Sequence, residues 1–223
     1  MDMDNLEEAS TAPVNPDVVG RNAARTRQAI IEAATEEFAS LGLGGARIDS
    51  IALRAGTNKR LLYYYFGNKE ALFQAVLERA YANIRTAERA LCLDELNPVE
   101  AIRQLVSFTW HYYITHPEFL TLLNSENLHQ AVHLKQSTAI KEMNSPLIAT
   151  LDTVLEKGRT AGLFRSGVDP LQLYISIAAM SFFYLSNHYT LSAVFGRDLR
   201  HPKAEAERLS HMTDLVLGYL LRE

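Results

Sequence analysis

Residues 58–69 gather side chains that suit contact with double-stranded DNA. Lys59 and Arg60 are adjacent, and their cations can reach guanine O6 and N7 or a phosphate. Asn58 can cap a helix or contact adenine. Lys69 and Arg47 each stand at the expected start of a helix, where a cation and the helix N-terminal N–H groups can bind one phosphate. Three consecutive residues offer hydroxyl donors to phosphate oxygens: Tyr63, Tyr64 and Tyr65.

Apolar residues in the same stretch would hold it on a core. Leu62 and Phe66 are four residues apart, so they share one face of a helix. We expect Tyr63 to lie partly in that core, which leaves Tyr64 and Tyr65 for phosphate contact.

These residues lie on or beside predicted helices. Helical periodicity runs through almost the whole chain after residue 20, and no strand alternation stands out. The first helices are predicted over residues 23–40, 47–55, 59–66 and 69–91. Gly56 can adopt a positive φ at the end of the second helix. Two short helices joined by a tight turn are typical of a helix-turn-helix, whose second helix enters the major groove.

The remainder of the chain indicates a larger helical region. Helices are predicted over residues 98–116, 117–124, 128–143, 146–162, 170–190 and 203–221. Pro146 either kinks one long helix or begins a new one. Residues 171–196 contain no Asp, Glu, Lys or Arg and are long enough to cross a bilayer. Polar residues interrupt them, so we expect a helix buried between protein surfaces and no membrane partner.

Charge is distributed unevenly along the chain, whose net charge is −4 over 223 residues. Residues 1–20 are acidic and contain proline and glycine, which predicts a disordered acidic tail. Residues 21–70 carry eight basic and five acidic side chains, so the positive charge expected of a DNA-binding domain is local. Cys92 is the only cysteine, and the N-terminus resembles no secretory signal. We therefore expect a cytoplasmic protein.

No arrangement of catalytic residues stands out. The chain shows no Ser/His/Asp order, nucleotide-binding loop or paired carboxylates, so we expect no enzyme and no cofactor. Glu126, His129 and His133 lie at i, i+3 and i+7 on an expected helix and could bind a metal ion. A polar helix surface or a pocket lining is the alternative, which we favour because the sequence HQAVH lacks the zincin pattern.

The run GTNKRLLYYYFGNKEAL, residues 56–72, resembles the signature of the tetracycline-repressor (TetR) family. Residues 38–42 and the Ile51-Ala52 pair are also similar to that family. The specific likeness covers about residues 24–75, and the rest of the chain matches in helix order. Residues 162–165 and 168–170, GLFR and VDP, resemble the segment that precedes the family's dimerisation helices.

The resemblance implies an all-α, two-fold symmetric repressor. Its helix-turn-helix domain would span residues 21–68, and residues 69–223 would bind a small-molecule effector and dimerise through helices near 170–190 and 203–221. The residues that would contact a palindromic operator are Lys59, Arg60, Leu61, Tyr63, Tyr64, Tyr65 and Lys69. Arg47 and the Arg60-Leu61 pair depart from the family's usual residues, so the operator sequence does not transfer from relatives.

Aromatic residues of the C-terminal region could line an effector pocket, since such pockets are mostly apolar with a few polar groups. The candidates are Trp110, Tyr113, Phe119, His129, Tyr174, Phe182 and Tyr184. Aromatic residues at helical spacing are equally typical of a plain core. The alternative functions are an activator, or a helical ligand-binding protein without DNA function; the intact run over residues 59–69 argues against the latter.

Overall fold

The computed structural model describes residues 16–221, with side chains placed for residues 22–143 and 146–221. Within this range the chain is helical and contains no β-strand, and an isolated bridge pairs Phe164 with Leu221. The predicted all-α class is confirmed. The first fifteen residues of the expected acidic tail lie outside the described residues, whereas residues 16–20 already belong to the first helix.

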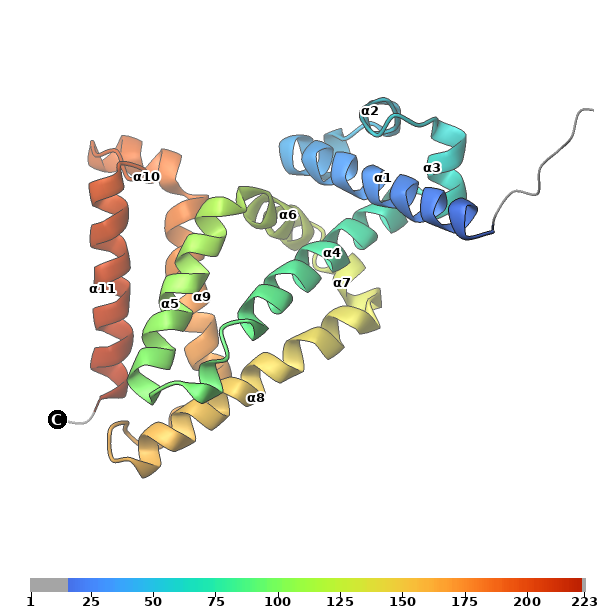
Figure 1. The fold of residues 1–223 in the computed structure, drawn as a ribbon. Coiled ribbons are helices and arrows are strands. Elements are labelled where there is room, and N and C mark those ends of the chain that lie inside the picture. The colour runs from blue at the N-terminus through green and yellow to red at the C-terminus, as the bar shows by residue number, and fades with distance from the viewer. Residues whose placement is uncertain (1–15, 222–223) are drawn as a thin grey trace, which may run out of the picture.

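Three helices form the N-terminal end of the molecule (Figure 1): α1 (Pro16–Gly45), α2 (Ile48–Arg54) and α3 (Lys59–Phe66). The helix α1 begins seven residues before its predicted start at residue 23. Gly42, with φ 67° and ψ 176°, breaks its helical geometry near the predicted glycine stop. The apolar stripe of α1 packs on Ile51 and Leu62, so the two short helices lie on one small core.

The helix α4 (Lys69–Arg89) connects the two ends of the molecule. Asn68 begins it by accepting a hydrogen bond from the Ala71 N–H at 2.7 Å. The first half of α4, including Phe73 and Leu77, belongs to the N-terminal core. Ile84 in its second half belongs to the C-terminal core. One uninterrupted helix is therefore part of both cores.

The C-terminal region consists of η1 (Leu93–Glu95), α5 (Pro98–Thr115), α6 (Pro117–Leu128), α7 (Val132–Gln136), α8 (Thr138–Thr160), α9 (Pro170–Ser186), α10 (His188–Phe195) and α11 (Pro202–Leu220). Proline stands in the first turn of four of these helices, where its missing N–H costs nothing. Asp169 caps α9 by accepting from the Gln172 N–H at 3.0 Å. Figure 1 shows α5 beside α9 and α11, with α8 running alongside α4.

The predicted helices 128–143 and 170–190 are each divided, and of the two alternatives at Pro146 the structure has one continuous helix. The chain breaks at Ser137, whose hydroxyl oxygen caps α8 at the Ile140 N–H, whereas Pro146 lies inside that helix. Here a good N-cap outweighs a proline that the helix can accommodate. The uncharged stretch 171–196 divides at Asn187 into α9 and α10. Among the described residues, no helix combines the length and the apolar character that a membrane span requires.

Gly158 in α8 gives the packing around Phe164 a direct test. A Cβ at residue 158 would lie 2.0 Å from Phe164 Cδ2, and the Phe164 ring is fully buried. Gly158→Ala should therefore lower the free energy of unfolding by about 1–3 kcal/mol, although alanine normally stabilises a helix interior. Gly44→Ala is the control, because its Cβ meets no atom within 4 Å. Equal unfolding midpoints in urea for both variants would contradict this packing.

Candidate DNA-binding interface and ligand site

The helix α3 has one face in the core and one face in solvent. Leu62 and Phe66 are buried, and the Arg27 guanidinium lies 5.2 Å from the centre of the Phe66 ring. Tyr64 points outward with 79% of its surface exposed. The predicted anchoring of this helix by Leu62 and Phe66 agrees with these positions.

The burial of Tyr63 and Tyr65 is the reverse of what the sequence predicted. Tyr65 is half-buried against the N-terminal core, and its ring meets Tyr64 edge-on at 5.3 Å. Tyr63 is the more exposed, at 40%, so the expectation that Tyr63 would be the core tyrosine is wrong. At 100° per residue, Tyr63 and Tyr65 lie on opposite sides of the Leu62–Phe66 stripe at about the same angle. Helical period alone therefore could not distinguish them.

The N-terminal turn of α3 carries two exposed cations. Asn58 uses its side-chain oxygen to cap the helix, accepting from the Leu61 N–H at 2.9 Å. Lys59 Nζ lies 3.2 Å from Asp49 Oδ1, in a pair so exposed that it holds the lysine only weakly. The side chain of Arg60 is exposed, and Leu61 is half-buried.

The start of α2 is stabilised by a residue that the sequence analysis missed. Arg47 precedes α2 and makes no side-chain cap, but its backbone N–H donates to Glu37 Oε1 at 3.1 Å. Glu37 is buried, and its other oxygen lies 3.6 Å from Arg54 Nη2. Glu37 thus anchors the backbone just before α2, while the side chain of Arg47 makes no cap, is exposed and remains available to a ligand.

Lys69 is the first residue of α4 and lies near the end of α1. Its Nζ is 3.5 Å from the Gly44 carbonyl oxygen, and the side chain is half-buried. The ammonium and the first N–H groups of α4 are thus held at one helix end, as a phosphate contact requires.

A buried ion pair lies at the other end of α4. Arg85 and Glu88 are each 4% exposed, and Arg85 Nη1 is 2.6 Å from Glu88 Oε2. Arg85 Nη2 donates a hydrogen bond to the Tyr174 hydroxyl of α9 at 2.7 Å. Burial raises the pKa of Glu88 to about 7, although the charges of Arg85 and Arg89 act in the opposite direction.

A cavity of about 280 Å³ adjoins this pair, between α4, η1 and α8. Its lining residues are Arg85, Glu88, Arg89, Cys92, Leu93, Asp94, Met143, Pro146, Leu147 and Thr150. Arg85 and Glu88 are not among the site residues expected from the sequence. The available signal was that both continue the apolar stripe of α4 through Tyr81, at i+4 and i+7.

The aromatic residues proposed for an effector pocket mostly form the C-terminal core. Trp110, Tyr113 and Phe119 are buried there, and Tyr174 and Phe182 pack against it. Tyr184 meets Trp110 edge-on at 5.5 Å. His129 lies apart from this group, with its Nδ1 2.7 Å from the Ser125 carbonyl oxygen at the end of α6. Of these candidates, Tyr174 is the one that a hydrogen bond joins to Arg85.

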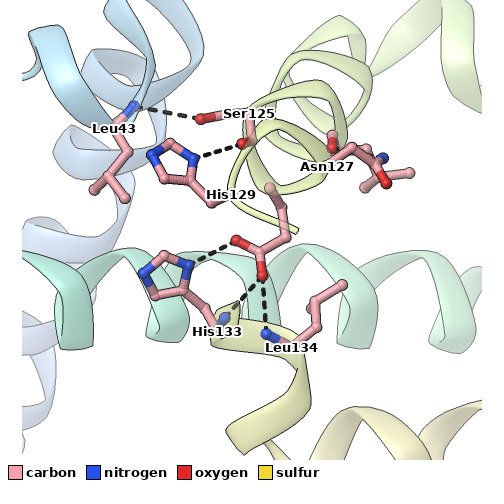
Figure 2. A network of polar contacts seen from close by, with 8 residues as sticks. Leu43, Ser125, Asn127, His129, His133 and Leu134 are labelled. Carbon is pink, nitrogen blue, oxygen red and sulfur yellow. Dashed lines mark hydrogen bonds and ion pairs between the residues drawn. The ribbon is translucent and has the colours of Figure 1, made fainter. Parts of the chain in front are cut away.

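Glu126 holds together the turn between α6 and α7 (Figure 2). Its carboxylate accepts hydrogen bonds from the backbone N–H groups of His133 and Leu134 at 2.9 and 3.0 Å, and it lies 2.7 Å from His133 Nδ1. The expected single helix through Glu126, His129 and His133 is wrong, because α6 ends at Leu128. Within residues 16–221, no three potential ligand side chains gather as a metal site.

The helices α9 and α11 share an exposed apolar face. A groove of about 380 Å³ runs between them, lined in part by Met180, Leu215 and Tyr219. Further large apolar residues on these helices are half-exposed: Leu171, Ile175 and Phe183. Contiguous exposed apolar surface of this kind marks an interaction site.

The sequence matches models of two protein domains. Residues 30–76 match the domain described as bacterial regulatory proteins, tetR family. Residues 98–216 match the domain described as tetracyclin repressor-like, C-terminal domain. The first match contains α2 and α3, and the second contains the α9–α11 groove helices except for the last residues of α11.

Named relatives and solved structures agree with these matches. The HTH-type transcriptional repressor NicS of Pseudomonas putida is 42% identical over 205 residues, covering 92% of this chain and 97% of NicS. The transcriptional regulator SCO4942 of Streptomyces coelicolor superposes with a TM-score of 0.67 at 24% identity, covering 89% of this chain and 99% of that one. The structure of AibR with isovaleryl coenzyme A and operator DNA superposes with a TM-score of 0.64 at 18% identity, covering 85% and 97%. The chain therefore belongs to the TetR family of bacterial transcriptional regulators.

Proposed function

We propose that this protein is a transcriptional repressor that binds a palindromic operator as a homodimer and is released by a small-molecule effector. The observation that carries the proposal is the orientation of α3, whose anchors are buried while Lys59, Arg60 and Tyr64 face solvent. NicS, similar along almost its whole length, is named a repressor. Because the operator is part of the chromosome, the protein would act in the cytoplasm, and the proposal gives it no catalytic role.

The DNA contacts divide into two classes. Arg60 and Lys59 stand in the first turn of α3, where side chains meet base edges in the major groove. Lys69, Arg47 and Tyr64 stand around that turn and would bind phosphates, which fixes the position of the protein without selecting sequence. The Asn58 oxygen already caps α3, so we assign Asn58 to capping.

The α9–α11 face is the proposed dimer interface. Its half-exposed Ile175, Phe183 and Leu215 would be buried by the same face of a second copy, as two-fold symmetry requires. Residues 21–68 would then contact DNA, residues 69–223 would bind the effector and the second copy, and α4 would join them.

Release would follow from a shift between two forms of the dimer. The operator selects the form whose recognition helices are spaced one helical turn apart, about 34–36 Å. An effector that binds a form with another spacing lowers the population competent for DNA. The effector would act through the second half of α4, since its first half is packed with α3 in one core.

Lys69→Ala tests the phosphate contact at the start of α4. The variant should bind every operator sequence more weakly. The slope of log K against log salt concentration should become shallower by about one, which corresponds to the loss of one phosphate contact. Fluorescence anisotropy at four salt concentrations measures both quantities. Lys203→Ala removes an exposed cation at the start of α11 and should leave the slope unchanged. An unaltered slope for Lys69→Ala would show that Lys69 does not contact a phosphate.

Arg60→Ala tests base recognition. Losing a guanidinium that contacts a guanine should cost about 1–3 kcal/mol at that base pair and relax the preference there. Selection of bound duplexes by wild type and variant compares the preferences at each position. A uniform loss across all sequences would instead assign Arg60 to the DNA backbone.

Phe183→Glu tests the dimer face. A buried, unpaired carboxylate on each side of the two-fold axis should convert the dimer to a monomer and weaken operator binding at least tenfold. Sedimentation velocity gives the oligomeric state. Leu128→Glu is the matched control, because Leu128 is also apolar and exposed (83%) but lies at the end of α6. A Phe183→Glu variant that remains dimeric would exclude this face as the dimer interface.

A further inference from the structure

Arg85 is a buried cation whose hydrogen-bonding capacity is only partly used. Its Nη2 donates to the Tyr174 hydroxyl. Its Nη1 lies close to Glu88 Oε2, but the two atoms are not aligned as a hydrogen bond. Its Nε finds no acceptor among the described residues. A guanidinium carries five N–H donors in a fixed fork, and each buried donor left unpaired is costly.

The cavity beside Arg85 provides room for the missing acceptor. Arg85 and Glu88 line it, and Arg89 adds a second cation. Leu93 and Leu147 contribute buried apolar surface on the side of η1 and α8. At about 280 Å³ it is at the small end of ligand sites, and it combines an apolar wall with a few polar groups.

We propose that this cavity binds a small organic monocarboxylate, one oxygen of which accepts a hydrogen bond from Arg85 Nε while its apolar body lies against Leu93 and Leu147. A hydrogen bond from a charged guanidinium to a carboxylate is charge-assisted and stronger than one between neutral groups. The role of this carboxylate as the effector rests on the function proposed above, but its binding to the protein can be measured without DNA.

The charges around the cavity favour a single negative charge. Arg85 and Arg89 together with Glu88 and Asp94 sum to neutral when both carboxylates are ionised. Protonation of Glu88, whose pKa burial raises to about 7, leaves the site with one net positive charge. A phosphate dianion carries two negative charges, which exceed the one net positive charge of the site beside Glu88 and Asp94. Inorganic phosphate should therefore not compete with the carboxylate.

Binding should therefore take up one proton on Glu88. The other groups facing Glu88 do not titrate near neutral pH. Burial lowers the pKa of Arg85, but Tyr174 and Glu88 outweigh this and raise it, and burial raises the pKa values of Tyr113 and Tyr174. The part of α8 that lines the cavity contributes no charged side chain. Affinity should fall by up to about tenfold per pH unit as the pH rises above 7.

Isothermal titration of the full-length dimer tests the proposal with two matched pairs of probes. Benzoate is compared with benzamide, and hexanoate with hexanamide, at pH 6.5, with inorganic phosphate as a further probe. At least one carboxylate should bind ten times more tightly than its amide, and phosphate should not bind. Equal affinity of acid and amide in both pairs, or binding of phosphate alone, would overturn the proposal.

Two variants separate ligand binding from folding. Glu88→Gln removes the internal carboxylate beside Arg85, so carboxylate affinity should rise severalfold and lose its dependence on pH. Arg85→Gln combined with Glu88→Gln leaves no buried ion and should abolish the preference for the acid. Arg159→Gln with Glu156→Gln neutralises an exposed pair at the same i, i+3 spacing and should change nothing. Unchanged carboxylate binding in the Arg85 double variant would contradict the proposed site.

The proposal and the repressor function can fail separately. Carboxylate binding that leaves operator affinity unaltered would support the site and reject its role in release. Release of the operator by the neutral amides, retained in the Arg85 double variant, would support the repressor and reject the carboxylate site.

Discussion

The helix α4 belongs to two hydrophobic cores at once, and this double packing joins the two ends of the molecule. Its 21 residues extend over about 30 Å, and its two halves are packed into different cores. Leu72 and Phe73 fix it to the helices that would contact DNA, while Ile84 fixes it to the region that would bind an effector. Since a packed helix does not bend freely, a displacement at Glu88 must reach Lys69 or be absorbed by one of the cores.

A second contact between the two regions limits how such a displacement can be absorbed. The Leu43 N–H at the end of α1 donates to Ser125 Oγ of α6 at 3.4 Å (Figure 2), and both residues are buried. Glu126, the next residue, ties α6 to α7 through His133. The N-terminal core therefore rests on both α4 and α6.

Most of the N-terminal fold could be predicted from the sequence, because local signals determine it: Asn58 and Asn68 cap helices, and Leu62 and Phe66 repeat at helical spacing. What could not be predicted depends on contacts distant in sequence. Glu37 binds the backbone N–H just before α2 from another helix, and the burial of Tyr65 depends on neighbours that helical period does not specify. The apolar stripe of α4 indicates that Arg85 is buried, but its hydrogen bond to the Tyr174 hydroxyl, 89 positions away, is visible only in the structure.

In the proposed dimer, α4 and the α9–α11 face together hold two copies of α3 at one fixed separation. Selection of bound duplexes from random DNA by the full-length protein tests this arrangement. An inverted repeat with a single spacing should be enriched, with its half-site centres about 34–36 Å apart. Enrichment of single half-sites, of repeats at several spacings, or of no sequence at all would contradict this arrangement.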